Sequence, residues 1–316
     1  MNTKKLVFII LLGGMITVMR LPQKYLTFIK KIGDKNNVPR ATINNAVKNT
    51  TTIKHRVSVK HPVKNPYDPR QASQERLERA ALECTKHNIV YNNSHVDSLL
   101  VSHMYKVIIK LISKVGSRTW RRVMREIDPT SDDAENRRIL SSLTSSEIDQ
   151  YVRGVFFREP LERIVSYYHF VFSPDTPQST SYFNQYYKYM RNGHVNATMN
   201  NKPYLTFSQF AQMIIDYDTK PARSWHWERQ YLVSHVCSYN YTFVGHMDHL
   251  AQDAPYFVQL AVGDLFHYPE VQERTGSVRF KETMSTLPHK IIDQLINYYR
   301  LDYEILGFKI PALSKK

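Results

Sequence analysis

A lysine and a glycine separate an apolar run from a basic helical pattern, an arrangement that could bind a phosphate or sulfate group. Residues 107–112 are rich in β-branched side chains and too few for a buried helix, so they predict a central parallel strand. Apolar residues recur at helical spacing from Trp120 onward, so residues 113–119, the anion loop, join this strand to a helix. Helix N-terminal N–H groups, a glycine and a lysine ammonium all suit an anion. We therefore expect an anion site at Lys114 and Gly116.

The charge around the anion loop is positive. Six basic residues and no acidic one occur in the stretch that holds Lys110, Lys114, Arg118, Arg121, Arg122 and Arg125. Such a field favours a polyanion. Two alternatives remain open, because a single glycine is often only a turn and a basic helix face is often only solvated. The loop does not fit the Walker A pattern, which requires a second glycine and a Lys-Ser or Lys-Thr pair.

A second strand and helix follow in the same order. Residues 152–157 form a short apolar run, and Pro160 suits the first turn of a helix that continues with apolar side chains at helical spacing. Arg158 and Ser166 are then expected near the end of this strand. The alternative for Arg158 is an ion pair that only caps the strand.

Four stretches resemble one enzyme family in the family's own order. Lys114–Trp120 resembles the 5′-phosphosulfate loop of the Golgi carbohydrate sulfotransferases, and Arg158–Ser166 resembles their 3′-phosphate motif. Residues 226–230, continuing to 241–245 and 253–261, and the stretch Tyr299–Phe308 resemble the branch with the chondroitin and dermatan 4-O-sulfotransferases and the HNK-1 sulfotransferase. The resemblance implies an α/β, P-loop-like sulfotransferase fold, with a central parallel sheet flanked by helices.

The anion loop departs from the family pattern at several positions. Ser113 replaces the usual proline, Ser117 the usual cysteine, and Arg118-Thr119 the usual Thr-Asn pair. These replacements keep polar atoms in the loop. The residues that follow Ser166 look more like heparan sulfate 2-O-sulfotransferase.

The resemblance implies the cofactor 3′-phosphoadenosine 5′-phosphosulfate (PAPS) and no metal. The 5′-phosphosulfate is assigned to one run of residues: Lys114, Val115, Gly116, Ser117, Arg118 and Thr119. The 3′-phosphate is assigned to Arg158, Arg163 and Ser166, with a salt bridge from Arg163 to Glu159 as the alternative for Arg163. Lys114 is also expected to act in catalysis, by stabilising the leaving phosphate oxygen.

Transfer to a hydroxyl also needs a general base. His226 is the first candidate, because the indoles of Trp225 and Trp227 could stack on sugar rings while the imidazole takes the proton. A structural role for His226 is the alternative, and His169 and Glu228 are the other candidate bases.

The expected acceptor is the 4-hydroxyl of N-acetylgalactosamine in chondroitin or dermatan, and not nucleic acid. The alternatives are the 3-hydroxyl of a terminal glucuronate, the 2-hydroxyl of a uronate, and a glycan-binding relative without activity. A P-loop NTPase or kinase is disfavoured by the missing Walker pair. The presence of Lys114, Arg158 and Ser166 favours an active enzyme. The oligomeric state stays open.

The N-terminal region predicts a single-pass type II Golgi membrane protein. Residues 1–5 would form a cytosolic tail and residues 6–21 a signal anchor, with a cleaved signal peptide as the alternative. Residues 22–70 would form a basic stem, and residues 71–316 the lumenal catalytic domain. Most of the formal charge of +15 lies before residue 71, so the domain itself is close to neutral.

Smaller features add to the lumenal prediction. The two cysteines, Cys84 and Cys237, could form one disulfide or stay as buried thiols. Four Asn-x-Ser/Thr sequons begin at residues 49, 92, 196 and 240. Helices are expected at residues 74–87, 207–216 and 288–299, helix or loop at 132–151, and a surface insertion at 173–201.

Overall fold

The computed structural model describes residues 67–90, 96–172, 205–216, 225–271 and 276–311, together with two short strand pairs outside these ranges. The chain divides into two compact units, Met1–Val63 and Lys64–Lys316. The first unit contains an antiparallel pair, β1 (Phe8–Leu12) and β2 (Met15–Met19). The predicted anchor, residues 6–21, includes this pair, and its other residues lie outside the described ranges. Most of the predicted stem and most of the predicted insertion at 173–201 also lie outside them.

Within the described residues, no helix combines the length and the apolar character needed to cross a membrane.

The second unit is built on a mixed four-stranded sheet with the order β3-β4-β5-β8. Its strands are β3 (Leu99–Ser102), β4 (Val107–Lys110), β5 (Val152–Phe157) and β8 (Phe243–His246). The predicted strands β4 and β5 lie in the centre and are parallel to each other and to β8. The prediction of a parallel sheet is wrong for β3, which pairs antiparallel with β4. The connection between these two strands is too short for a parallel crossover.

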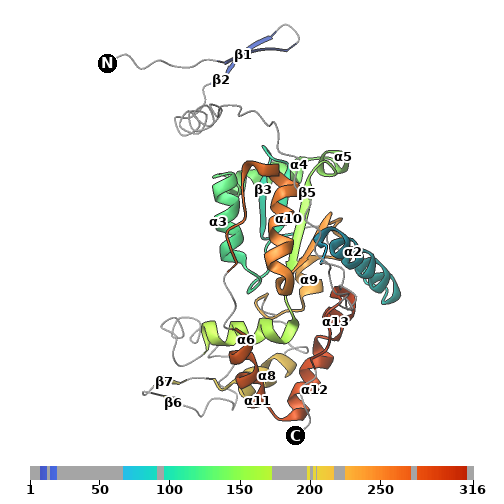
Figure 1. Cartoon of the computed structure of the whole chain (residues 1–316), viewed down its shortest axis with the longest axis vertical. Helices are drawn as coiled ribbons and strands as arrows, with labels where there is room; N and C mark the ends of the chain where they lie inside the picture. The colour runs from blue at the N-terminus through green and yellow to red at the C-terminus, as the bar shows by residue number, and fades with distance from the viewer. Residues whose placement is uncertain are drawn as a thin grey trace, which may run out of the picture. The chain divides into compact units, whose positions relative to one another are not determined.

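Helices cover both faces of this sheet (Figure 1). On one face lie α3 (Ser117–Ile127) and α10 (Leu250–Val262), whose Trp120 and Phe257 rings meet edge to face. A Cβ at Gly154 of β5 would lie 2.3 Å from the Phe257 ring, so only glycine allows this close packing. On the other face, Leu140 of α4 (Ala134–Ser142) packs on β3 and β4, and α5 (Ser145–Ile148) follows.

Helix α2 (Pro69–Lys86) covers the free edge of β8. The N–H of Val244 donates to the Ser73 hydroxyl over 2.9 Å, and Arg76 donates to the Val244 carbonyl over 3.0 Å. These bonds satisfy polar groups that an edge strand would otherwise expose. The far end of α2 is joined to the segment after α9 by a disulfide between Cys84 and Cys237, which confirms the paired alternative.

Four of the remaining helices, α6, α8, α11 and α12, lie beyond the carboxyl end of β5 (Figure 1). The other two, α9 and α13, lie between these four and α2. The bounds of these helices are α6 (Pro160–Val171), α8 (Phe207–Asp216), α9 (Gln230–Ser234), α11 (Gly276–Ser285), α12 (His289–Tyr298) and α13 (Arg300–Leu306). Short pieces complete the fold: β6 (Thr198–Met199), β7 (Lys202–Pro203), and 3-10 turns at Met247–His249 and Gly263–Leu265. The helices predicted near 74–87, 207–216 and 288–299 are confirmed as α2, α8 and α12.

Candidate active site

The anion loop has the geometry of a helix N-terminal site. Strand β4 ends at Lys110 and α3 begins at Ser117, with Gly116 as its N-cap at φ 70°. Lys114 is also left-handed, at φ 68°, so the chain turns sharply twice between strand and helix. Ser117, Arg118 and Thr119 form the first turn of α3, whose N–H groups have no acceptor within the helix. These three residues therefore offer N–H groups to an anion.

Val115 does not fit its predicted role. Its N–H donates to the carbonyl of Ile112 over 3.2 Å, and its side chain is buried in the core. The N–H group is used inside the turn that positions Lys114 and Gly116. Val115 therefore shapes the anion loop and does not offer its N–H to a ligand.

Three cations surround the mouth of the loop. The Lys114 ammonium lies 4.1 Å from the centre of the Phe170 ring and the Arg118 guanidinium 4.8 Å from it, so both cations lie against the same aromatic ring. Burial, together with the charges of Arg118 and Arg158, lowers the pKa of Lys114 to about 8. Like charges held this close are typical of a site that binds an anion.

Arg158 is positioned from several sides. Its N–H donates to the side-chain oxygen of Gln230 over 3.1 Å, and the Gln230 amide donates back to the Arg158 carbonyl over 2.7 Å. The side chain contacts Glu162 at 3.3 Å and the Lys114 carbonyl at 3.5 Å. Arg158 thus forms the ion pair considered as its alternative and also reaches the anion loop. Ser166 is half-buried and lies one turn beyond Glu162 on α6.

Arg163 is placed differently from either prediction. Its side chain is fully buried and donates to three carbonyls: Ser113 at 3.0 Å, Glu228 at 2.7 Å and Trp225 at 3.2 Å. The side chain is therefore enclosed by protein and bonded to the backbone, which corrects its assignment as a cofactor ligand. The predicted partner Glu159 instead accepts the hydroxyl of Tyr303.

His226 lies beside the anion loop. Its Nδ1 is 3.0 Å from the Ser113 hydroxyl, and its ring stacks on Tyr167 at 4.8 Å and lies tilted against Trp225 at 3.9 Å. Burial and the charges of Arg163 and Lys114 lower the pKa of His226 to about 4, so its ring is neutral near neutral pH.

The flanking residues differ in their exposure. Trp225 is 58% exposed and can meet a ligand, whereas Trp227 is 1% exposed and belongs to the core. Glu228 is buried and accepts from the N–H of Arg229, while His169 contacts Thr283 on α11 at 2.7 Å. The side chain of His226 contacts the anion loop through Ser113.

Comparisons with known proteins identify the family. A model of the sulfotransferase family matches residues 97–309, which is more than half of the chain. The chain belongs to the sulfotransferase family. Carbohydrate sulfotransferase 14 of Danio rerio is 26% identical over 232 residues, which cover 67% of this chain and 62% of that protein. Carbohydrate sulfotransferase 9 of Homo sapiens is 24% identical, covering 73% of this chain and 58% of that protein.

A third relative is matched over more of its length. Carbohydrate sulfotransferase 11 of Danio rerio is 26% identical over 288 residues, which cover 79% of this chain and 82% of that protein. The chain thus spans about three fifths of the first two relatives and most of the third. No solved structure matches the chain.

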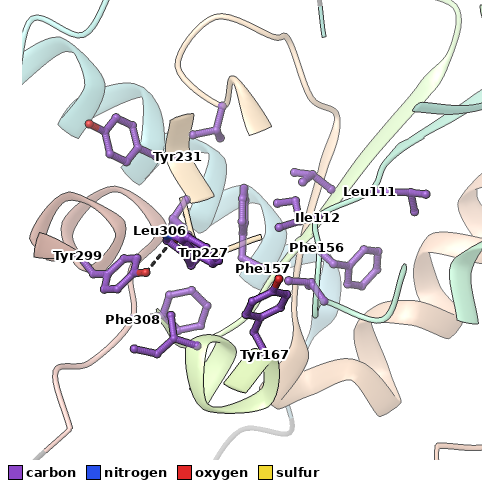
Figure 2. Close-up of a cluster of buried hydrophobic side chains, with 14 of the residues drawn as sticks. Leu111, Ile112, Phe156, Phe157, Tyr167, Trp227, Tyr231, Tyr299, Leu306 and Phe308 are labelled. Carbon is purple, nitrogen blue, oxygen red and sulfur yellow. Dashed lines mark hydrogen bonds between the residues drawn. The ribbon is translucent and has the colours of Figure 1, made fainter. Parts of the chain in front are cut away.

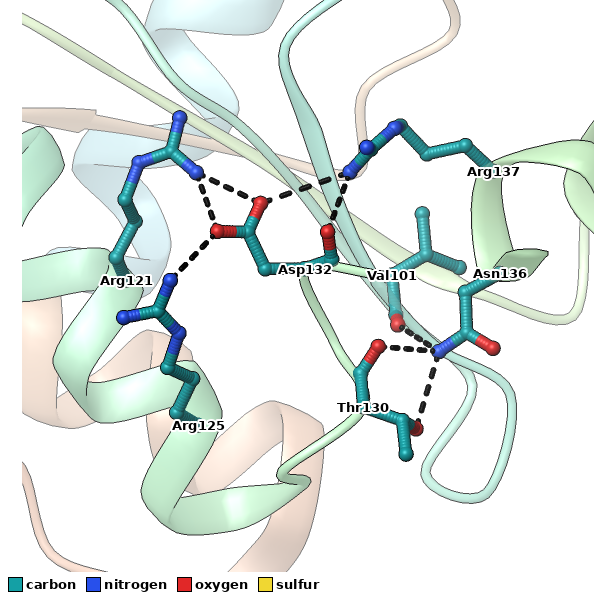
Figure 3. Close-up of polar contacts among 7 residues, drawn as sticks. All are labelled: Val101, Arg121, Arg125, Thr130, Asp132, Asn136 and Arg137. Atoms are coloured by element: carbon teal, nitrogen blue, oxygen red, sulfur yellow. Dashed lines mark hydrogen bonds and ion pairs between the residues drawn. The ribbon is translucent and has the colours of Figure 1, made fainter. Parts of the chain in front are cut away.

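In this sulfotransferase, acidic side chains neutralise several of the basic residues that the sequence places around the anion loop. Arg121 and Arg125 both bind Asp132, at 2.6 Å and 2.9 Å, and Arg137 joins them (Figure 3). Lys110 binds Asp97 at 2.8 Å. Because Asp97 and Asp132 lie outside the counted stretch, the expected field over all six basic residues is wrong. At the mouth of the loop, Lys114 lies close enough to Arg118 and Arg158 for their charges to lower its pKa.

Residues of the C-terminal motif of the sulfotransferase bond to the backbone of the segment that follows His226. Asp302 is fully buried, and its carboxylate accepts the N–H groups of Gln230 and Tyr231 over 2.8 Å each. Tyr299 donates its hydroxyl to the Trp227 carbonyl over 2.6 Å, within a cluster of buried side chains (Figure 2). The sequence resemblance includes Gln230 and Asp302 but suggests no role for either. The structure shows that Asp302 positions Gln230, which in turn positions Arg158.

We expect Glu159 to make stability depend on pH. Burial raises the pKa of Glu159 to about 7, although the Tyr303 hydroxyl opposes this shift. Between its ordinary pKa and about 7, the folded protein keeps a proton that the unfolded chain releases, so stability falls as pH rises. Fully ionised, Glu159 should lower the free energy of unfolding by about 3 kcal/mol relative to its protonated form. Urea unfolding at about pH 5 and about pH 8 measures this.

The variant Glu159→Gln provides the comparison, because an amide cannot ionise. The free energy of unfolding of the variant should rise relative to wild type as pH increases through this window. Parallel pH profiles for the two proteins would show that Glu159 does not titrate there.

Proposed function

We propose that this protein transfers a sulfuryl group from PAPS to a hydroxyl of a glycan. The observation that carries the proposal is the convergence of Lys114, Arg118 and Arg158 at the N-terminus of α3, beside His226. The family match and the carbohydrate sulfotransferase relatives support it. The P-loop-like classification is part of the proposal and is supported by the strand–loop–helix order of β4 and α3.

The residues present fit the two ends of the cofactor. The N–H groups of Ser117, Arg118 and Thr119 and the Lys114 ammonium suit the 5′-phosphosulfate, because they combine a helix N-terminus with positive charge. Arg158 and Ser166 suit the 3′-phosphate. When bound, PAPS would supply the activated sulfuryl group, and 3′-phosphoadenosine 5′-phosphate would be the leaving group.

Lys114 and Arg118 assist the transfer electrostatically. Both cations lie where the leaving phosphate oxygen would be held, and they would stabilise the charge that develops there without rearrangement. Arg118 contacts the same Phe170 ring as Lys114, and its charge is close enough to lower the pKa of Lys114. The mechanism requires Lys114 in its protonated form.

His226 takes the proton of the acceptor hydroxyl. Its neutral ring is ready to accept a proton, and Ser113 orients it through Nδ1. Arg163 and Lys114 lower its basicity in the protein alone. The negative charge of the bound cofactor offsets these cations and raises the basicity of the imidazole during transfer.

The acceptor meets the exposed ring of Trp225. An aromatic face next to a charged site is suited to the apolar face of a sugar. We propose the 4-hydroxyl of N-acetylgalactosamine in chondroitin or dermatan as the acceptor group, in line with the 226–261 and 299–308 motifs. We also propose a Golgi location, with residues 6–21 as a type II anchor.

Transfer of labelled sulfate from PAPS tests the activity. The purified protein is incubated with desulfated chondroitin, dermatan, heparosan and N-glycans, and the labelled products are digested to disaccharides. Label at the 4-position of galactosamine is expected. Label on another sugar would confirm sulfuryl transfer and show that the acceptor group is a different one. No transfer from folded protein that also fails to bind PAPS would refute the proposal.

The variant His226→Ala tests the general base. Turnover should fall about 100-fold or more, as expected when a positioned base is lost, while the affinity for PAPS stays within about twofold. His169→Ala is the comparison, because this histidine is the other candidate base on α6 and contacts Thr283 at 2.7 Å. Equal losses in the two variants, or a normal rate in His226→Ala, would assign the base to another residue.

A further inference from the structure

Arg163 joins two segments that the proposed reaction must hold in register. Its guanidinium donates through Nε to the Ser113 carbonyl of the anion loop and through its two terminal nitrogens to the carbonyls of Glu228 and Trp225. The first contact is with the segment that holds the cofactor. The other two are with the segment that carries the candidate base and the exposed indole.

These two segments are far apart in the sequence, since Ser113 and His226 are separated by 113 positions. Arg163 lies on α6, a third element, and its side chain is completely enclosed. The Ser113–His226 contact at 3.0 Å is a second link across the same junction. The carbonyl groups on both sides thus meet one rigid, planar cation.

We propose that Arg163 is a positioning residue that sets the distance and angle between the sulfuryl group of the cofactor and the acceptor hydroxyl. This inference rests on the proposed function, because it assigns the cofactor to the anion loop and the acceptor to residues 225–228. In-line transfer is sensitive to such alignment, and a displacement of about 1 Å can reduce the rate about 100-fold.

Arginine suits this role because of its shape. Its N–H groups point in fixed directions within one plane, so three carbonyls bound to it keep a fixed arrangement. A lysine ammonium keeps the charge but is a point on a flexible stem, and it cannot hold the same three acceptors at these distances. Arg163→Lys therefore removes the geometry and retains the positive charge.

The chain offers a matched control in Arg153. This arginine of β5 is also buried, and it donates to the carbonyls of Asn240 and Ile148, away from the anion loop. Arg153→Lys makes the same chemical change at another buried arginine that binds carbonyls, one that also forms an ion pair with Asp149 at 3.2 Å. It measures the general effect of disturbing a buried arginine.

The test compares kinetics and binding in Arg163→Lys, Arg153→Lys and wild type. In Arg163→Lys, kcat should fall about 100-fold, while the Kd for 3′-phosphoadenosine 5′-phosphate and the KM for the acceptor each stay within about threefold. In Arg153→Lys, kcat, the nucleotide Kd and the acceptor KM should all stay within about threefold of wild type after correction for the folded fraction. A loss of nucleotide affinity equal to the loss of kcat, or equal losses of kcat in both variants, would overturn the proposal.

Hydrogen exchange provides a measurement that does not depend on the activity. In Arg163→Lys, the amides of residues 113–119 and of 226–231 should both exchange about tenfold faster than in wild type, and in Arg153→Lys they should not. Unchanged exchange would refute the link between the segments. If exchange is faster in Arg163→Lys but the wild-type protein transfers no sulfate, the link between the segments is confirmed and the proposed function is refuted.

Discussion

The variant Lys114→Ala is expected to lose PAPS affinity and turnover together, with kcat/KM reduced about 1,000-fold. Removing one preorganised group that stabilises developing charge typically reduces the rate about 100-fold to 1,000-fold, and the lost charge also weakens cofactor binding. Isothermal titration with 3′-phosphoadenosine 5′-phosphate and sulfate transfer to the acceptor measure the two effects.

Lys106→Ala is the control for this variant. Lys106 lies just before the opposite end of β4 and, like Lys114, has a left-handed backbone, with φ 49°. Both substitutions remove one lysine charge from a similar backbone position, but Lys106 is exposed and bonds to Gln150. Normal cofactor binding by Lys114→Ala, or equal losses in the two variants, would contradict the assignment of Lys114.

The affinity for the nucleotide should also depend on pH because of Lys114. The pKa of this ammonium is lowered to about 8, so the positive charge proposed to bind phosphate is lost as pH rises above that value. Affinity should therefore decrease above about pH 8. Lys114→Arg keeps its charge throughout this range and should bind with an affinity that no longer falls there.

The largest expected effect on stability comes from Asp302→Ala. The substitution leaves the buried N–H groups of Gln230 and Tyr231 without their acceptor, although it also removes a carboxyl whose pKa burial raises to about 6. Losing two bonds to a charged acceptor and opening a cavity should lower the free energy of unfolding by about 3 kcal/mol. Urea unfolding with the disulfide intact measures this change.

Activity should fall in the folded fraction of Asp302→Ala as well, because Gln230 would no longer hold Arg158 in place. Asp293→Ala is the control, since Asp293 is an exposed residue of α12 and its loss should change stability by less than about 0.5 kcal/mol. If Asp302→Ala changes the free energy of unfolding by less than about 0.5 kcal/mol, the bonds from the Asp302 carboxylate to the first N–H groups of α9 do not stabilise the fold.

Much of the fold follows from local patterns in the sequence. The apolar runs of β4 and β5 and the helical spacing after Trp120 and Pro160 are properties of short segments, and the structure has these elements at the expected places. The anion loop follows from the same local rules, because a strand that runs directly into a helix leaves the helix N–H groups at the sheet edge.

The direction of β3 and the acidic partners of the basic residues could not be predicted in this way. The charge count from Lys110 to Arg125 did not include Asp97 and Asp132, which bind three of these side chains across the fold. An ion pair between separate segments depends on which segments become neighbours. That information lies in the packing and not in the spacing of charges.

The sequence by itself determined the chemistry available to this protein, and the tertiary structure decided which residues can perform it. Residue types and spacing place Lys114, Arg158 and His226 among the candidates, because an anion site and a base each need a particular functional group. Burial and long-range contacts then separate the roles: Arg163 is enclosed and binds carbonyls, while Asp302 supports the site from the far end of the sequence. Neither role leaves a local pattern, because each depends on side chains that fill space between segments far apart in the chain.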